Sequence, residues 1–215
     1  MSTTRSIRGQ ILEIGEPTKA ERDSIFQALT QPAIHVALGL RAPPIRSMYD
    51  SDILELHRGD EVRREPVRYH ALRDKIDGRL VGFFLDFGWD HANDSVRELD
   101  LAFPDPSDRN LGAYFDATII VSHYLFENGL AKRVRWRVRA RGDRVPKRHE
   151  RHGARLVSKQ VEQHPVSGEW MNTFIFEFSI ADYRNLVKHI DEDVTTVDYE
   201  ASRTTIWDLL RNRGD

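Results

Sequence analysis

Residues 109–114, with the sequence Arg-Asn-Leu-Gly-Ala-Tyr, open the longest helical pattern in the chain and could bind a phosphate group. The first backbone N–H groups of a helix have no partners within the helix and carry partial positive charge, so they accept a phosphate. Gly112 would let the backbone approach such a group closely, and Arg109 would add a positive charge. The segment therefore predicts a site for a phosphorylated ligand.

A row of arginines forms a second candidate binding surface. Residues 132–139 alternate strictly, which places Arg133, Arg135, Arg137 and Arg139 on one face of a predicted strand. Residues 132–155 hold eleven Lys and Arg against two acidic residues, a local charge of +9, so the rest of the chain carries −11. The row could bind a coenzyme phosphate or a polyanion such as a nucleic acid or an acidic protein surface. Alternatively, acidic residues of the same chain, or of a second copy in a homodimer, cover it.

Other residue types narrow the chemistry. The sequence has no cysteine, which excludes disulfides, thiolate metal sites and cysteine nucleophiles. Its nine histidines lack metal-ligand spacing, since His149 and His152 are the one close pair and nothing nearby in the sequence completes a site. We therefore expect no metal, and we expect the chemistry to depend on oxygen and nitrogen groups.

Length and hydropathy bound the architecture. A chain of 215 residues, 40 % of them hydrophobic, can bury one sizeable core but is too short for two ordinary domains. We expect one domain over residues 1–190 and a tail with a short helix over residues 191–215. No apolar run approaches the roughly 20 residues of a membrane-spanning helix, and residues 1–9 lack the apolar stretch of a signal peptide. The expectation is a soluble, cytoplasmic protein without a membrane partner.

Hydrophobic periodicity and turn signals predict the order of the elements. The predicted strands are residues 6–14, 68–75, 79–87, 95–103, 132–139, 155–163 and 170–180. One predicted helix begins near Thr18, and the others cover residues 32–40, 52–57, 111–127, 145–152, 181–189 and 204–211. Residues 41–66, rich in charge and proline, are predicted to be a mobile connection that covers a substrate site or is a plain solvated linker.

This order, together with the residues themselves, resembles the GNAT superfamily of N-acetyltransferases, and within it the branch of ribosomal-protein N-terminal acetyltransferases. The resemblance covers residues 6–183, and its strongest stretch is the strand at 96–103 with the turn at 109–117. The fold that it implies is α+β, with a central mixed, mostly antiparallel sheet of about seven strands flanked by helices. The activity that it implies is transfer of an acetyl or other acyl group from acetyl-CoA, or another acyl-CoA, to a primary amine of a peptide terminus or small molecule.

The resemblance also implies roles for individual residues. The strand at 96–103 would part from the strand at 132–139, and a backbone N–H of Leu101, Ala102 or Phe103 would then polarise the thioester carbonyl. Glu98 is the implied general base, directly or through water, and Asp100, on the same face, is its competitor; each could instead simply pair with an arginine. The residues implied to bind the pyrophosphate are Arg109, Asn110, Leu111, Gly112, Ala113 and Tyr114.

The sequence also departs from the family pattern. Tyr114 stands where the pyrophosphate turn favours a small residue, and Asp105 and Asp108 bring negative charge close to the implied diphosphate. The predicted helix at 145–152 has no tyrosine to match the general acid of many relatives. Two alternatives therefore stand beside the enzyme. One is a GNAT-derived binding or regulatory module without turnover, and the other is an acyltransferase whose acceptor is a nucleic-acid amine.

Overall fold

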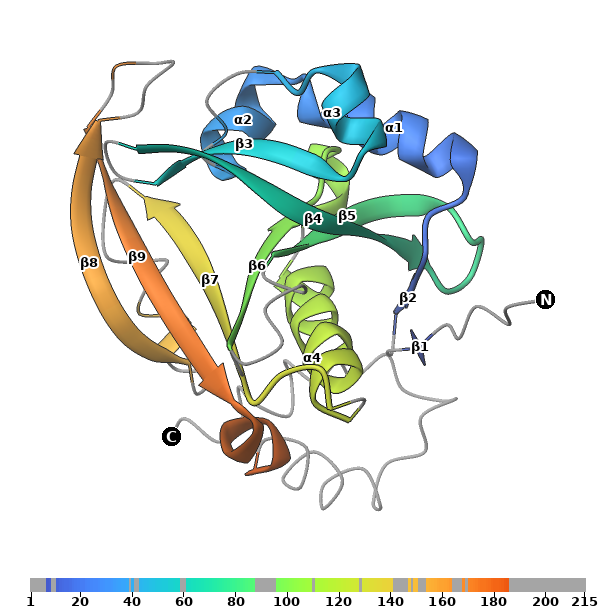
Figure 1. Ribbon diagram of the computed structural model, residues 1–215. Helices are drawn as coiled ribbons and strands as arrows, with labels where there is room; N and C mark the ends of the chain where they lie inside the picture. The colour runs from blue at the N-terminus through green and yellow to red at the C-terminus, as the bar shows by residue number, and fades with distance from the viewer. Residues whose placement is uncertain are drawn as a thin grey trace.

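The computed structural model shows a single curved sheet with helices on both of its faces (Figure 1). The structure describes residues 7–8, 11–38, 40, 43–58, 61–87, 96–109, 111–127, 129–140, 147, 149–150, 154–163, 168 and 170–185. Within these ranges no helix has both the length and the apolar composition to cross a membrane. The helix predicted at 204–211 and the domain boundary predicted at residue 190 lie outside the described residues.

The elements follow the predicted order closely. The helices are α1 (Lys19–Leu29), α2 (Pro32–Leu38), α3 (Arg46–Asp50), the 3₁₀ helix η1 (Pro106–Asp108) and α4 (Leu111–Glu127). The strands are β1 (Ile7–Arg8), β2 (Leu12–Gly15), β3 (Ile53–Arg58), β4 (Glu61–Asp74), β5 (Leu80–Phe87), β6 (Val96–Ala102), β7 (Arg133–Ala140), β8 (Arg155–Gln163) and β9 (Trp170–Ser179). Lys147, His149 and Glu150 are helical, and a last helix covers residues 180–185, so both short helices expected there are present in their described parts.

The segment at 41–66 differs most from the prediction. Residues 52–57, predicted as a helix, belong to the turn and strand that follow α3, and β3 pairs antiparallel with the first half of β4. Asp52 has a left-handed backbone (φ 56°), which ends helical geometry there, and Leu54 is buried beside Tyr49. The segment is therefore built into the sheet and the core, and the prediction of a mobile connection or solvated linker is wrong.

The predicted first strand is also two strands, because β1 pairs antiparallel with β2. With β1 and β3 added, the described residues form a sheet of nine strands, where about seven were expected. The hydrogen-bonded path runs β1-β2-β4-β5-β6-β7-β9-β8, and β3 lies off it against β4. All neighbouring pairs are antiparallel except β6 and β7, which are parallel. The sheet is thus mixed and mostly antiparallel, as predicted.

Two hydrophobic clusters fix the helices on opposite faces of the sheet (Figure 1). On one face α4 packs through Ala117, Ile120 and Leu125 on side chains of β2, β4, β5 and β6. On the other face α1, α2 and α3 pack through residues such as Ile25, Ile34 and Tyr49 on the alternate side chains of β4 and β5. A strand in the middle of the sheet therefore presents alternate residues to α4 and to the α1–α3 layer.

Candidate active site

β6 and β7 lie side by side only over their first residues. Their parallel ladder begins where Val96 pairs with Arg133 and ends where Leu99 lies opposite Trp136. Beyond that point β6 continues against β5, and β7 continues against β9. The two strands therefore part, and the end of β6 borders the gap.

Gly82 on β5 allows the end of β6 to pack closely. A Cβ atom at this position would lie 2.8 Å from the carbonyl oxygen of Ala102 and 2.9 Å from the ring of Phe103. Both neighbours belong to the segment at 101–103, whose backbone N–H groups the resemblance implies beside the thioester carbonyl of an acyl-CoA. A side chain at Gly82 would push that segment away from β5, so this glycine sets the shape of the gap. Gly82 was not among the predicted site residues, although a glycine within an otherwise apolar strand is a signal of close backbone approach.

Arg109 fixes the loop that leads from β6 into α4. Its Nε donates to the carbonyl of Phe103 at 2.7 Å, and its Nη2 donates to the carbonyl of Pro104 at 2.7 Å. Asp105 caps η1 by accepting bonds from the hydroxyl and the backbone N–H of Ser107, and these bonds lower the pKa of Asp105. The guanidinium of Arg109 therefore holds the backbone that precedes α4. Any contact between Arg109 and a pyrophosphate would be made from this position.

The N-terminal turn of α4 begins at Leu111, so Leu111 and Gly112 belong to it, whereas Asn110 lies outside the described residues. Ala113 is buried in the core beneath α4. Tyr114 is 38 % exposed and packs edge-on against Phe103 with ring centroids 4.7 Å apart. The bulk of Tyr114 is thus accommodated by its contact with Phe103, the residue that follows β6.

The acidic residue nearest to this turn in the sequence is neutralised. Arg79 donates from both terminal nitrogens to the two carboxylate oxygens of Asp108, each at 2.8 Å. This bidentate pair raises the pKa of Arg79 above its ordinary value. The charge of Asp108, which was expected to lie close to the implied diphosphate, is therefore balanced within the chain.

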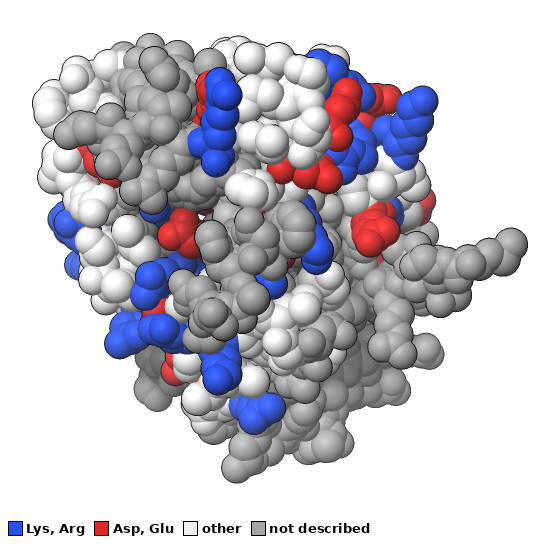
Figure 2. All heavy atoms as spheres, viewed as in Figure 1, with Lys and Arg blue, Asp and Glu red and all other residues white. Residues whose placement is uncertain are grey.

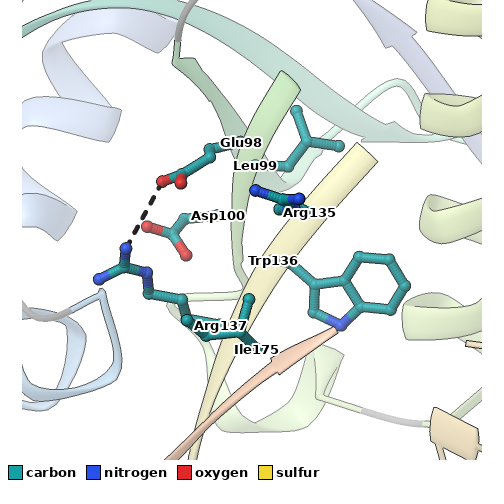
Figure 3. Close-up of a pocket in the computed structure, with 7 residues that line it drawn as sticks. All are labelled: Glu98, Leu99, Asp100, Arg135, Trp136, Arg137 and Ile175. Atoms are coloured by element: carbon teal, nitrogen blue, oxygen red, sulfur yellow. Dashed lines mark ion pairs between the residues drawn. The ribbon is translucent and has the colours of Figure 1, made fainter. Parts of the chain in front are cut away.

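A small pocket lies where β6 and β7 part (Figure 3). Glu98 and Asp100 point to the same side of β6, and Arg137 reaches toward them from β7. Arg137 Nη2 lies 3.7 Å from Glu98 Oε2. The side chain of Glu98 is 40 % exposed, whereas Asp100 is buried. The structure therefore brings the two predicted catalytic residues into one pocket, with Glu98 the more accessible, and it places Glu98 beside an arginine. The lining residues are Glu98, Leu99, Asp100, Arg135, Trp136, Arg137 and Ile175.

Glu177 on β9 gathers arginines of the predicted row. Its carboxylate, 2 % exposed, accepts from Arg135 Nε at 2.8 Å and lies 3.4 Å from Arg133 Nη1. Arg155 of β8 also donates to it. Burial would raise the pKa of Glu177, but the hydrogen bonds and positive charges around it outweigh burial and lower the pKa. Arg139, at the end of the row, donates to the carbonyl of Ala37 on α2 at 3.3 Å. Acidic and carbonyl groups of the same chain therefore contact each arginine of the row and leave part of Arg133 and Arg135 exposed.

A group of buried polar side chains beneath α4 was not anticipated from the sequence. Asp86 and Arg97 form an ion pair at 3.6 Å with side chains 3 % and 9 % exposed. Burial raises the pKa of Asp86 to about 6 against the attraction of Arg97. His70 stacks on Phe84 with ring centroids 4.2 Å apart, and its burial lowers its pKa to about 4. The sequence did contain a signal for this buried group, because Asp86 is the one charged residue in the otherwise apolar strand β5.

The geometry can support acyl transfer to an amine. The gap would provide a place for an extended donor, the first turn of α4 would present its backbone N–H groups to a phosphate, and the pocket offers carboxylates as proton acceptors. Within the described ranges, no three His, Asp or Glu side chains are grouped so that they could hold a metal ion.

Comparisons with known proteins identify the fold. No protein-family model matches the sequence, and no curated protein matches it. A solved GCN5-related N-acetyltransferase from Brucella melitensis is similar in structure with a TM-score of 0.65 and 17 % identity, covering 98 % of this chain and 96 % of that one. A spermidine N-acetyltransferase from Vibrio cholerae, in complex with CoA and spermine, is similar with a TM-score of 0.62 and 14 % identity, covering 81 % and 98 %.

A third similar structure is an aminoglycoside acetyltransferase in complex with coenzyme A, with a TM-score of 0.55 and 12 % identity, covering 81 % of this chain and 98 % of that one. These likenesses show that the chain has the GNAT fold, and the α+β prediction is confirmed. The similarity to the ribosomal-protein branch, the domain boundary, the homodimer and the cytoplasmic location stay predictions.

Proposed function

We propose that the protein transfers an acyl group, acetyl in the first instance, from an acyl-CoA to a primary amine of a small molecule or a peptide terminus. The observation that carries the proposal is the parting of β6 and β7 directly ahead of the loop that begins α4. The gap would take the pantetheine arm, and the first turn of α4 would take the pyrophosphate. Solved structures of the same fold in complex with coenzyme A support this assignment.

The local residues fit such a donor. Gly82 lets the segment from Ala102 to Phe103 lie close to β5 beside the gap, and Arg109 holds that segment by its carbonyl groups. Arg79 balances the carboxylate of Asp108, so this carboxylate does not repel a diphosphate at the helix start. Tyr114 packs edge-on against Phe103, beside the path that a pantetheine chain would take.

The chain's own groups would then perform the transfer. A bound acyl-CoA supplies a thioester carbonyl as the electrophile. A backbone N–H between Leu101 and Phe103 would polarise that carbonyl, and Glu98 would take a proton from the amine, with Asp100 as the second candidate. The amine nitrogen forms a bond to the carbonyl carbon while the carbon–sulfur bond breaks. A protonated amine gives up two protons in total; one ends on the departing thiolate and the other in solvent.

Calorimetric titration with acetyl-CoA and with CoA tests the donor site. We expect both to bind, and we expect Gly112→Glu to abolish binding because it places bulk and negative charge in the first turn of α4. Gln27→Glu adds the same charge at an exposed position of α1 and is the matched control. Unchanged binding in the Gly112 variant would overturn the placement of the phosphate site.

Thiol release from acetyl-CoA over a panel of primary amines tests turnover. Glu98→Gln should lower kcat by about 10²–10⁴ while leaving acetyl-CoA affinity unchanged, because the loss of a general base affects the chemical step. An undiminished rate would remove Glu98 from this role and make Asp100→Asn the next variant. Coenzyme binding without turnover on any amine would favour the binding or regulatory module.

A further inference from the structure

The pocket between β6 and β7 already contains an ion pair that an acceptor amine has to share or displace. Glu98 Oε2 faces Arg137 Nη2 at 3.7 Å, and the side chain of Arg137 is only 15 % exposed. An incoming ammonium group would compete with the guanidinium for the same carboxylate. An acceptor that carries only amines would add positive charge beside Arg137 and weaken its pairing with Glu98, while the buried Asp100 of the same pocket would stay beside the guanidinium.

A second observation concerns the surface next to the pocket. Glu177 is approached by Arg133, Arg135 and Arg155, so among the described residues of this cluster three guanidinium groups surround one carboxylate. The side chains of these arginines are 42 %, 34 % and 69 % exposed, so their outer N–H groups reach solvent. A guanidinium has five N–H donors and can bind a second carboxylate while it keeps the first. The cluster therefore has a surplus of positive charge and donors.

The cluster and the pocket lie on one face of the sheet. Arg133, Arg135 and Arg137 alternate along β7 and share a face, and Arg135 both lines the pocket and donates to Glu177. Figure 2 shows Lys and Arg gathered over the part of the molecule where β8 and β9 lie in Figure 1, whereas both signs of charge are mixed near α1 and α3. Two guanidinium groups therefore border the pocket on its β7 side, those of Arg135 and Arg137.

We propose that the acceptor is a small amino carboxylate, whose carboxylate binds Arg137 while its amine binds Glu98. This inference rests on the proposed acyltransferase function. The acceptor exchanges the internal ion pair for two new pairs, so neither Glu98 nor Arg137 loses a partner of opposite charge. Because the two groups lie within 3.7 Å of each other, the amine and the carboxylate of the acceptor are close neighbours, as in an α-amino acid. A second carboxylate, as in aspartate, would bind the arginine cluster around Glu177.

Matched acceptors separate this proposal from general amine acetylation. Initial rates of thiol release are measured with L-aspartate, with its diamide, and with spermidine. The diamide keeps the α-amine and the carbon skeleton but has no carboxylate. We expect kcat/KM for L-aspartate to exceed that for the diamide and for spermidine by about tenfold or more, the difference of one charge-assisted pair. Equal or reversed preference would overturn the proposal while leaving the acyltransferase function intact.

The variant Arg137→Gln tests the residue itself. It should raise KM for L-aspartate by about tenfold and lower kcat/KM for L-aspartate more than kcat/KM for the diamide, so that the selectivity disappears, while KM for acetyl-CoA stays unchanged. Arg64→Gln is the control, because Arg64 is an exposed arginine paired with Glu55 on the β3–β4 hairpin. Unchanged selectivity in the Arg137 variant would refute the assignment.

A binding measurement keeps the inference testable if no amine is acetylated. L-aspartate is titrated into the protein saturated with CoA, and into the Arg137→Gln protein under the same conditions. Binding to the first and not to the second supports the carboxylate site independently of turnover. Absence of binding to both proteins would overturn this proposal, and absence of CoA binding would instead overturn the proposed function.

Discussion

Replacing His70 by phenylalanine removes a buried imidazole while keeping an aromatic ring on Phe84. The His70 ring lies nearly parallel to Phe84, with an interplanar angle of 5°, and meets the edge of Tyr124 at 5.2 Å. His70 is 4 % exposed, and among the described residues its Nε2 has no hydrogen-bond partner. The folded protein therefore strongly favours the neutral imidazole, and the arginine at position 68 adds to this preference.

The sign and size of the pH effect follow from the two pKa values. Burial lowers the pKa of His70 from 6.5 to about 4 in the folded protein. Between these values the unfolded chain binds a proton that the folded chain does not, so wild-type stability falls as pH falls from 6.5 toward 4. A shift from pKa 6.5 to about 4 corresponds to roughly 3 kcal/mol, of which roughly 2 kcal/mol is reached at pH 5.

Urea unfolding followed by tryptophan fluorescence, at several pH values from 8 to 5, measures this effect. We expect the free energy of unfolding of wild type, minus that of His70→Phe, to fall by about 2 kcal/mol over this range. Asp86, whose pKa is raised to about 6, titrates in the same range but is present in both proteins, so its contribution largely cancels. A difference that is constant from pH 8 to pH 5 would refute the reasoning, since it would mean that His70 binds protons equally in both states.

Three further substitutions test packing and charge elsewhere. Gly82→Ala places a methyl carbon 2.8 Å from a backbone carbonyl of the gap segment, and we expect a loss of about 1–3 kcal/mol in urea unfolding together with weaker CoA binding by calorimetry. Asp116→Ala removes the carboxylate that accepts two backbone N–H bonds at the start of β2, at 3.0 and 2.8 Å; stability should fall by about 2–4 kcal/mol, and a loss below about 1 kcal/mol would argue against a structural role. Glu177→Gln leaves three arginines together without their carboxylate, so the free energy of unfolding should fall by about 3 kcal/mol, with partial recovery in high salt; an effect independent of salt would contradict the electrostatic reason.

Local periodicity was enough to predict the elements whose burial is regular. The helix at 111–127 has the predicted bounds, because its apolar residues keep helical spacing for its whole length. β7 was predicted within one residue at each end, because arginine alternates there with apolar residues. The charged segment at 41–66 gave no such pattern. Leu54 is buried by pairing with β4, a contact that depends on residues further along the chain.

The residue types of the candidate site were predictable from the sequence, but the ion-pair partners of these residues were less so. Glu98 and Asp100 were expected on one face of a strand, and they share a pocket. Arg137 beside Glu98, and Glu177 among the arginines, depend on how β7 pairs with β6 and β9. Such cross-strand partners are fixed by register, which one sequence does not reveal. The neutralisation of Asp108 by Arg79, 29 residues away, has the same origin.

The short ladder between β6 and β7 is a weak seam in the sheet, because few backbone hydrogen bonds hold the two strands together. Among the described residues, four pairs from Val96–Arg133 to Leu99–Trp136 connect the two strands, whereas β7 and β9 pair over eight. Amide groups along this seam should exchange with deuterium through local opening, at a lower free energy than those of β5 or β9. A ligand seated across the gap would tie the two halves of the sheet together and slow that exchange. Slower hydrogen–deuterium exchange of these amide groups would thus show that a ligand occupies the gap. The sheet would be most rigid when the gap is filled.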